Sequence, residues 1–278
     1  MKHLCTFIFL IGWCAVAPAQ ERKVVSTDMH CRACDSPDGK PGYAFLASAA
    51  LPGTGQAANG QWWKTGLFLA VEATAVSVYL YKTHTGRTGR RRHARHADQK
   101  WSVVAYAQWL VENYNYEPDQ VLNPEFQGKA IPDPQWDAAA DQDVINIEAL
   151  RSLERETPYA SGFYFSHTLP DYGSQQYYEL ISKYYQFGPG WTDWDDPYAG
   201  RPMVADIDYM PGNWLEHARM GSRFNRDLSR ARQMVALLIV NHFVAAFDAY
   251  FTHLLQNKRI GTRAFMRNGP GLRLTYKF

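Results

Sequence analysis

The sequence predicts a mainly α-helical protein: a helical bundle with one or two membrane-embedded or buried apolar helices and a short C-terminal strand. Apolar residues dominate Trp62–Tyr81 and Met234–Leu255, and as helices both stretches could cross the ~30 Å hydrocarbon core of a bilayer. Between them, apolar residues recur at the spacing of amphipathic helices. Strict alternation of apolar and polar residues, which indicates a strand, is clearest at Leu272–Phe278.

The N-terminus has the order of a secretory signal. Lys2 and His3 give a short basic start, an apolar stretch follows, and the small residues Ala-Pro-Ala at positions 17–19 suit a signal peptidase. We therefore expect residues 1–19 to be a signal peptide that is removed on export. An uncleaved N-terminal anchor is the alternative.

Export also bears on the cysteines. Cys5 and Cys14 would leave with the signal peptide, so Cys31 and Cys34 remain as a C-x-x-C pair in a leader segment, residues 20–42. In an exported chain this pair favours a small structural disulfide over a redox site, because no strand–helix pattern follows it. A four-thiolate zinc site would need a second pair.

Residues 43–113 are predicted to form a first hydrophobic helical unit that includes a basic loop. The run Trp62–Tyr81 has tryptophans at one end and tyrosines at the other, the placement of interfacial anchors. Glu72 lies in mid-run, where a carboxylate is costly in lipid, so a buried helix of a soluble domain is the alternative. We expect membrane contact.

Residues 82–100 show the sharpest change of composition in the chain. Seven lysines and arginines face a single acid, Asp98. Beside an apolar helix, such a block is typical of a cytoplasmic loop or of contact with anionic lipid headgroups, here at Arg87–Arg95. A merely solvated loop is equally compatible. We expect no nucleic-acid partner, because no aromatic residue alternates with the arginines and the net charge of the chain is only +2.

The rest of the chain divides into a polar and aromatic middle, residues 114–213, and a long C-terminal helix with a tail, residues 214–278. In the middle, helical spacing predicts helices at Asp141–Glu156 and Gln175–Phe187. The last helix, Trp214–Gln256, contains no proline. A self-made barrel needs at least about eight strands, so we expect the terminal strand to dock on the helical body or on an edge strand of a partner.

A further motif follows the short apolar segment Tyr43–Leu51 and runs into the start of Trp62–Tyr81. It reads PGxGQxxNGxxWK, at positions Pro52, Gly53, Gly55, Gln56, Asn59, Gly60, Trp63 and Lys64. It resembles the opening motif of a bacterial (Bacteroidota-type) envelope protein family classed as a domain of unknown function, and segments at residues 177–193 and 241–249 are similar to members of the same group. The resemblance implies an exported, membrane-associated, helical protein and assigns no catalytic residue. Thr54, where an apolar or small residue is expected, is a mild departure.

Polar side chains interrupt the apolar stretch of the last helix at Asn241, His242, Asp248 and His253. Unpaired polar groups in such a place cost several kcal/mol, so each needs a partner. We expect interhelical hydrogen bonds, with Glu72 as one partner. A metal or proton site is the alternative, although His-x₁₀-His is not a standard ligand spacing.

No serine-hydrolase, zinc-peptidase or phosphate-loop spacing is present. We therefore expect a non-enzymatic cell-envelope protein without a cofactor, a membrane-associated scaffold or assembly factor of the inner membrane that contacts a protein partner. The alternative is a metal-dependent membrane enzyme using His242, Asp248 and His253. Charge predicts that Trp62–Tyr81 crosses inward, the arginine-rich segment stays cytoplasmic, and Met234–Leu255 returns.

Overall fold

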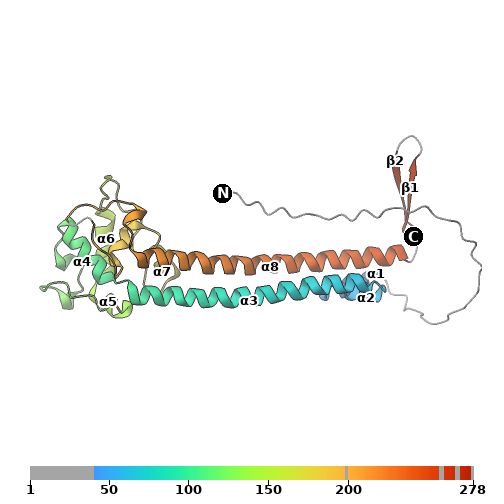
Figure 1. Cartoon of the computed structure of the whole chain (residues 1–278), viewed down its shortest axis with the longest axis horizontal. Coiled ribbons are helices and arrows are strands. Elements are labelled where there is room, and N and C mark those ends of the chain that lie inside the picture. The colour runs from blue at the N-terminus through green and yellow to red at the C-terminus, as the bar shows by residue number, and fades with distance from the viewer. Residues whose placement is uncertain (1–40, 198–199, 257–259, 267–269, 277–278) are drawn as a thin grey trace, which may run out of the picture. The chain divides into compact units, whose positions relative to one another are not determined.

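The computed structural model describes residues 41–197, 200–256, 260–266 and 270–276 (Figure 1). The described residues all belong to one compact unit, which begins at Lys40. The expected signal peptide and the Cys31–Cys34 pair lie outside the described residues.

Two long helices, α3 (Trp62–Lys100) and α8 (Gly212–Gln256), lie side by side (Figure 1). Contacts along their length show that they run antiparallel: Lys64 with Asp248, Lys82 with Asp227, and His96 with Glu216. The predicted long C-terminal helix and the mainly helical class are confirmed. In the described part of the chain, α8 is the one helix that is long and apolar enough to cross a membrane, by length and composition alone.

The basic segment is a helix, so the predicted loop is wrong. α3 continues unbroken through residues 82–100 because arginine, lysine, alanine and glutamine favour helices and no proline intervenes. Two glycines of this segment lie where α3 and α8 pack closely. A Cβ on Gly86 would meet the Leu228 side chain at 2.6 Å, and one on Gly89 would meet Phe224 Cβ at 2.9 Å. The high charge that suggested a loop is equally compatible with the exposed faces of two packed helices.

Two short helices, α1 (Pro41–Ala50) and α2 (Thr54–Ala58), form a hairpin against the apolar ends of α3 and α8. Gly53 makes the turn with φ of 100°, a conformation that side-chain-bearing residues rarely adopt. The end of α1 lies near His242, whereas the residue after α2, Asn59, lies near Ala249. The hairpin therefore runs part of the way along α8 and then returns.

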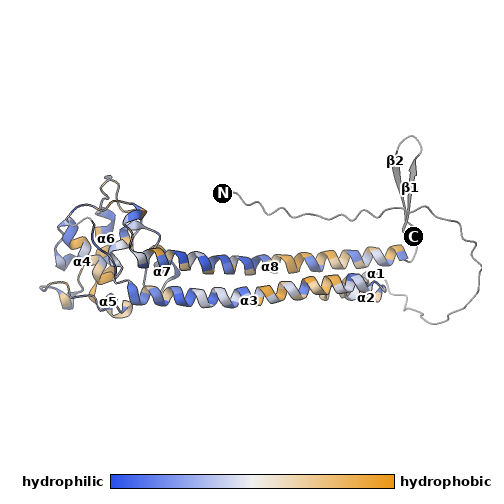
Figure 2. Cartoon of the chain, in the orientation of Figure 1, coloured by the Kyte–Doolittle hydropathy of each residue, from blue (hydrophilic) through white to orange (hydrophobic). Residues whose placement is uncertain are grey.

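The two long helices divide into regions of different composition (Figure 2). We call residues 41–81 and 234–256 the apolar end, and residues 82–100 and 212–233 the basic stalk. The stalk carries twelve lysines and arginines against three acids. Residues 101–211, as far as they are described, form a head between the stalk segments of α3 and α8.

The head is built from short helices around an aromatic core. They are α4 (Val103–Tyr114), η1 (Pro118–Gln120), η2 (Pro124–Phe126), α5 (Ala138–Val144), α6 (Ile147–Glu156), α7 (Gln175–Leu180), η3 (Tyr185–Gly190) and η4 (Ile207–Tyr209). Trp101 and Trp191 are completely buried, and their indole N–H groups donate to the carbonyls of Phe187 and Ile181, both at 3.0 Å. At these two tryptophans a large aromatic surface is buried together with a satisfied N–H group.

Both helices predicted in the head are interrupted. Asp141–Glu156 splits into α5 and α6, because the Asn146 side chain accepts from Ala149 N at 3.1 Å and starts a new helix there. Gln175–Phe187 ends at Leu180 as α7 and resumes as the 3₁₀ helix η3. Local caps and the packing of the head override a continuous helical spacing.

The tail forms a hairpin of β1 (Ile260–Met266) and β2 (Pro270–Tyr276). The strands are antiparallel, with Ile260 opposite Tyr276 and Met266 opposite Pro270. The predicted strand Leu272–Phe278 overlaps β2, but its main-chain partner is the preceding segment of the same chain. The prediction missed β1 because glycine, threonine and alanine weaken its apolar alternation.

Candidate functional site: a polar seam in the apolar end

Burial at the apolar end is inverted relative to a soluble domain. The exposed residues are large and apolar, and they include Leu46, Leu51, Trp62, Trp63, Leu67, Leu80, Ile239, Val240, Phe243, Val244, Phe247 and Phe251. The buried ones, Pro52 and Leu254 aside, are small or polar: Ala44, Ser48, Gly53, Gly55, Gln56, Ala75, Asn241, Ala245, Ala246 and Ala249. Helices that associate within lipid show this distribution, with small and polar residues between them.

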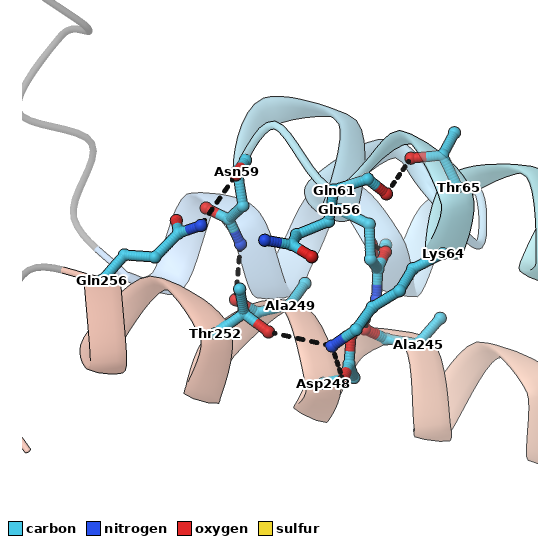
Figure 3. Close-up of polar contacts among 11 residues, drawn as sticks. Gln56, Asn59, Gln61, Lys64, Thr65, Ala245, Asp248, Ala249, Thr252 and Gln256 are labelled. Atoms are coloured by element: carbon cyan, nitrogen blue, oxygen red, sulfur yellow. Dashed lines mark hydrogen bonds and ion pairs between the residues drawn. The ribbon is translucent and has the colours of Figure 1, made fainter. Parts of the chain in front are cut away.

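A line of polar contacts, the polar seam, joins α1, α2 and α3 to α8 through this region. Figure 3 shows the part of it around Gln56, Asn59, Lys64 and Asp248. The side chains of the seam are Ser48, Gln56, Asn59, Lys64, Glu72, Asn241, His242, Asp248 and His253. The motif of residues 52–64, together with Ser48 and Glu72, supplies one side of the seam, and the polar residues of the last helix supply the other. Contacts that bring together positions up to 197 apart in the sequence therefore hold the apolar end together.

Gln56 is the most deeply buried member, with no exposed surface. Its amide nitrogen donates to the carbonyl of Ala245 at 2.7 Å and to Asp248 Oδ2 at 3.1 Å (Figure 3). Its amide oxygen accepts from the Ser48 hydroxyl at 2.7 Å. This glutamine therefore links three helices with its hydrogen-bonding groups satisfied, as a buried amide requires.

Lys64 and Asp248 form the ionic part of the seam. Lys64 Nζ lies 2.7 Å from Asp248 Oδ1, and the two side chains are 22% and 29% exposed. Since Asp248 Oδ2 also accepts from Gln56, both carboxylate oxygens have partners. Removing either charge would leave the other half-buried without a counter-ion, which is far more costly than removing both.

Asn59 closes the seam at the end of α8. Its Nδ2 donates to the carbonyl of Ala249 at 2.8 Å, and its Oδ1 lies 3.2 Å from His253 Nδ1. Its main-chain carbonyl accepts from Gln256 Nε2 at 2.9 Å (Figure 3). These bonds fix the segment between α2 and α3 against the last turns of α8.

Glu72 also has partners on α8, and the expected interhelical hydrogen bonds are present. Glu72 Oε2 accepts from Asn241 Nδ2 at 3.0 Å, and Oε1 lies 3.2 Å from His242 Nε2. His242 Nδ1 is 2.8 Å from the carbonyl of Ala49, and because a carbonyl only accepts, this nitrogen carries the hydrogen. His242 thereby satisfies one of the last carbonyls of α1, which has no partner within its own helix.

Gly55 shows why the motif needs glycine. A Cβ at this position would collide with the carbonyl oxygen of Ala44 and would lie 2.7 Å from both Ala249 Cβ and Ser48 Oγ. The main chain of α2 therefore packs against α1 and α8 at once, and its own N–H donates to Ser48 Oγ at 2.8 Å. Only glycine allows this approach.

The remaining motif positions make lesser contributions. Pro52 is buried in the turn before α2, and Gly60 has φ of 74° ahead of α3. Trp63 is 69% exposed, with Lys64 Nζ 5.9 Å from its ring. Sequence reasoning missed Ser48 as a partner of Gln56 and did not pair Lys64 with Asp248, because neither pair has a spacing that identifies it.

The three residues of the metal-enzyme alternative do not come together. His242 faces Ala49 and Glu72, Asp248 faces Lys64 and Gln56, and His253 faces Asn59. Among the residues that the structure describes, no group of three or more His, Cys, Asp or Glu side chains is arranged to hold a metal ion. The seam is suited to joining helices in a medium of low dielectric constant, where each ionic or amide contact is strengthened.

Comparison with known families gives one match, in the first half of the chain. Residues 38–132 match the model of DUF5683, a family of unknown function, over roughly a third of the chain. The matched segment holds α1, α2, the motif, all of α3 and α4. Neither curated proteins nor solved structures give a match.

Proposed function

We propose that this protein is a non-enzymatic scaffold or assembly factor of the cell envelope, anchored in a membrane by its apolar end. The observation that carries the proposal is the inverted burial there, with large apolar side chains outside and the polar seam inside. In water such a surface would be unfavourable, whereas in lipid it is the favoured arrangement. The α1–α2 hairpin suits this setting, because re-entrant segments are tolerated at membrane depth when protein contacts satisfy their main chain.

The proposed topology has α8 crossing the membrane and the apolar half of α3 crossing beside it in the opposite direction, with Lys64 and Glu72 of α3 paired to α8. The ~30 Å from Trp62 to Tyr81 matches the thickness of the hydrocarbon core. The hydrogen bonds and the ion pair of the polar seam hold α3 and α8 together. Residues 1–19 act as a signal peptide and place the leader segment with Cys31 and Cys34 on the outer side of the inner membrane. The basic stalk and the head then lie on the cytoplasmic side, in keeping with the positive-inside rule.

The stalk and the head are the parts that would meet partners. Lys82–Asp227, at 2.8 Å, is the one ion pair between a lysine or arginine and an acid in the described stalk, so most of the stalk charge is uncompensated. The arginines next to the membrane would contact anionic headgroups. In the head, Phe163 and Tyr164 project from a turn, 77% and 62% exposed, and suit a protein partner.

Two measurements test the proposal. The protein should stay with the membrane fraction in high salt and in alkaline carbonate, and detergent should release it. With Cys31 and Cys34 replaced by serine, a cysteine at position 91 (Arg91→Cys) should react with a membrane-impermeant maleimide in inside-out vesicles and not in intact spheroplasts. Release by carbonate would contradict membrane anchoring, whereas labelling in intact spheroplasts would contradict only the orientation.

A further inference from the structure

Three histidines meet where the basic stalk enters the head. His93 and His96 lie on α3 and His217 lies on α8, and we call them the histidine cluster. The rings of His93 and His217 are stacked, with centroids 3.5 Å apart and 20° between their planes. The ring of His96 also stacks on the ring of His217, with centroids 5.5 Å apart. His93 and His217 are 3% and 0% exposed, so two imidazoles are held face to face away from water.

Hydrogen bonding fixes His217 in one neutral form. Its Nε2 lies 2.9 Å from the carbonyl of Tyr178, so Nε2 carries the hydrogen and Nδ1 is left as an acceptor. That Nδ1 is buried without a hydrogen-bond partner, and so is Nδ1 of His96. A proton added to either nitrogen would create a charged donor with no acceptor, which is costly in a buried site.

The groups around the cluster do little to offset such a charge. The positive charges of Arg90 and Lys100 on α3 disfavour protonation of His93 and His96, respectively. Two acids favour protonation, but of His96 alone: Glu216 on α8 and Asp193 in the head. Glu216 lies 3.9 Å from His96 Nε2, and its side chain is 64% exposed. On α7, the other element packed against the cluster, the hydroxyl of Tyr178 donates a hydrogen bond to Asp98.

The remaining neighbours of the cluster are aromatic. Trp191 lies 5.1 Å from the His217 ring and 5.6 Å from the His96 ring, and Phe224 lies 5.2 Å from His93. These rings help to keep water away from His93 and His217, whereas the His96 side chain keeps 15% of its surface exposed.

Burial is the main cause of the pKa shifts in the cluster. Together with the charges of His96 and Arg90, it lowers the pKa of His93 from 6.5 to about 4. Burial and the neighbouring His93 lower the pKa of His217 to about 2. The pKa of His96 is also lowered, by burial first, with Glu216 and Asp193 acting against it.

We propose that the histidine cluster is an acid-sensitive joint, in which uptake of a proton by its stacked imidazoles separates α3 and α8 at the entrance to the head and frees the head from the stalk. The cluster is suited to this because its contacts join three parts of the chain: α3, α8, and the head segments that carry Tyr178 and Trp191. The joint lies outside the apolar end, so the inference does not depend on the membrane placement.

The direction of the pH dependence follows from the lowered pKa values. The closed joint binds protons less well than an open one, in which each histidine has its ordinary pKa of 6.5. Closure is therefore most stable above pH 6.5 and weakens as the pH falls from 6.5 towards 4. Within that window, each participating imidazole raises the open-to-closed ratio by up to about tenfold per pH unit.

The test measures the distance between the stalk and the head in the full-length protein in detergent, with the native cysteines replaced by serine. Spin labels are placed on the exposed positions Gln176 in the head and Ser222 in the stalk. A second label pair within the head, on Gln176 and Glu156, reports unfolding of the head itself. The variant His93→Gln/His217→Gln cannot be protonated but keeps an amide donor for Tyr178, and the exposed His84→Gln is the matched control.

We expect the Gln176–Ser222 distance distribution to broaden between about pH 7.5 and about pH 5, while the pair within the head stays unchanged. His84→Gln should behave as the parent protein, and the double variant should stay narrow. An unchanged distribution at about pH 5 in the parent protein, or broadening that persists in the double variant, would overturn the proposal. If the distance distribution of the double variant is already broad at neutral pH, the single variant His96→Gln replaces it in the test. Its distribution should broaden at a lower pH than that of the parent protein. Broadening at the same pH would contradict the proposal.

Discussion

The head and the apolar end bury opposite kinds of side chain. In the head, Trp101, Tyr106 and Phe187 are completely buried around a close-packed aromatic core. At the apolar end, aromatic residues such as Trp62 and Phe243 are 72% and 61% exposed, and amides and small residues fill the interior. The head is therefore stabilised by burial of its apolar side chains, whereas the apolar end exposes most of its large apolar side chains to the surrounding medium.

The largest expected difference concerns phenylalanine in the two regions. Phe187→Ala should cost about 3–5 kcal/mol of unfolding free energy, because it leaves a cavity in the core of the head. Phe243→Ala should change the unfolding free energy of the detergent-solubilised protein by no more than about 0.5 kcal/mol, since this side chain packs little within the protein. Chemical denaturation followed by circular dichroism measures both. Equal costs would mean that the two regions bury aromatic residues alike.

The second comparison introduces a charge on α8. Phe243→Arg should disfavour insertion by about 2.5–3.5 kcal/mol, the cost of an arginine near the centre of a bilayer. Asn225→Arg, at an exposed position in the stalk, is the matched control and should be neutral within about 0.5 kcal/mol. The fraction of protein that resists carbonate extraction is the readout. If both variants stay fully inserted, residue 243 does not face lipid.

A third comparison concerns the effect of an alanine substitution at two glycines of the apolar end, Gly55 and Gly66. Gly55→Ala should destabilise the packing of α2 by about 1–3 kcal/mol or more, because the added methyl group meets the main chain of α1. Gly66→Ala, where nothing lies within 4 Å, should stabilise α3 by about 1 kcal/mol. Thermal unfolding in detergent should show shifts of opposite sign. Shifts of the same sign would argue against the close approach at Gly55.

The smallest expected effect concerns buried carboxyl groups. Both acids of the polar seam have basic partners, whereas Glu154 in the head accepts from the Tyr106 hydroxyl and from Leu169 N, and burial raises its pKa from 4.5 to about 7. The folded head therefore binds a proton more tightly than the unfolded chain. Its stability should rise as the pH falls through 7 towards 4.5, by at most about 1.4 kcal/mol per pH unit.

Glu154→Gln is the matched variant, because its amide can bond to the same two groups without titrating. The stability of the parent protein minus that of Glu154→Gln, followed from about pH 8 to about pH 6, isolates this carboxyl from the histidine cluster. A difference that does not vary with pH would show that the buried Glu154 keeps an ordinary pKa.

Composition and periodicity were enough to predict the helical class, the long last helix and the need for partners of its polar residues. Glu72 was a foreseeable partner, because a carboxylate in an apolar run must be neutralised by something nearby. The links of Gln56 and Lys64 to Asp248 could not be foreseen, since 192 and 184 positions separate them. The cluster of His93, His96 and His217 was missed for the same reason.

The errors share a physical cause. A basic sequence was interpreted as a loop because charge suggests solvent, yet two packed helices have enough outward surface to expose every arginine of residues 82–100. The helices of the head were predicted too long because spacing does not reveal where a side chain such as Asn146 caps a new helix. The signal peptide, the disulfide and the partners remain predictions.

The most direct test of the membrane anchor is the accessibility of spin labels along α8. Nitroxides at positions 240, 243, 244 and 247 should collide more often with apolar oxygen than with a water-soluble nickel chelate when the protein is reconstituted into vesicles. Labels at positions 222 and 225, on the stalk, should show the reverse preference. Nickel accessibility that is equally high at both sets of positions would show that the exposed apolar face of α8 meets water, and it would contradict the proposal that the apolar end lies in a membrane.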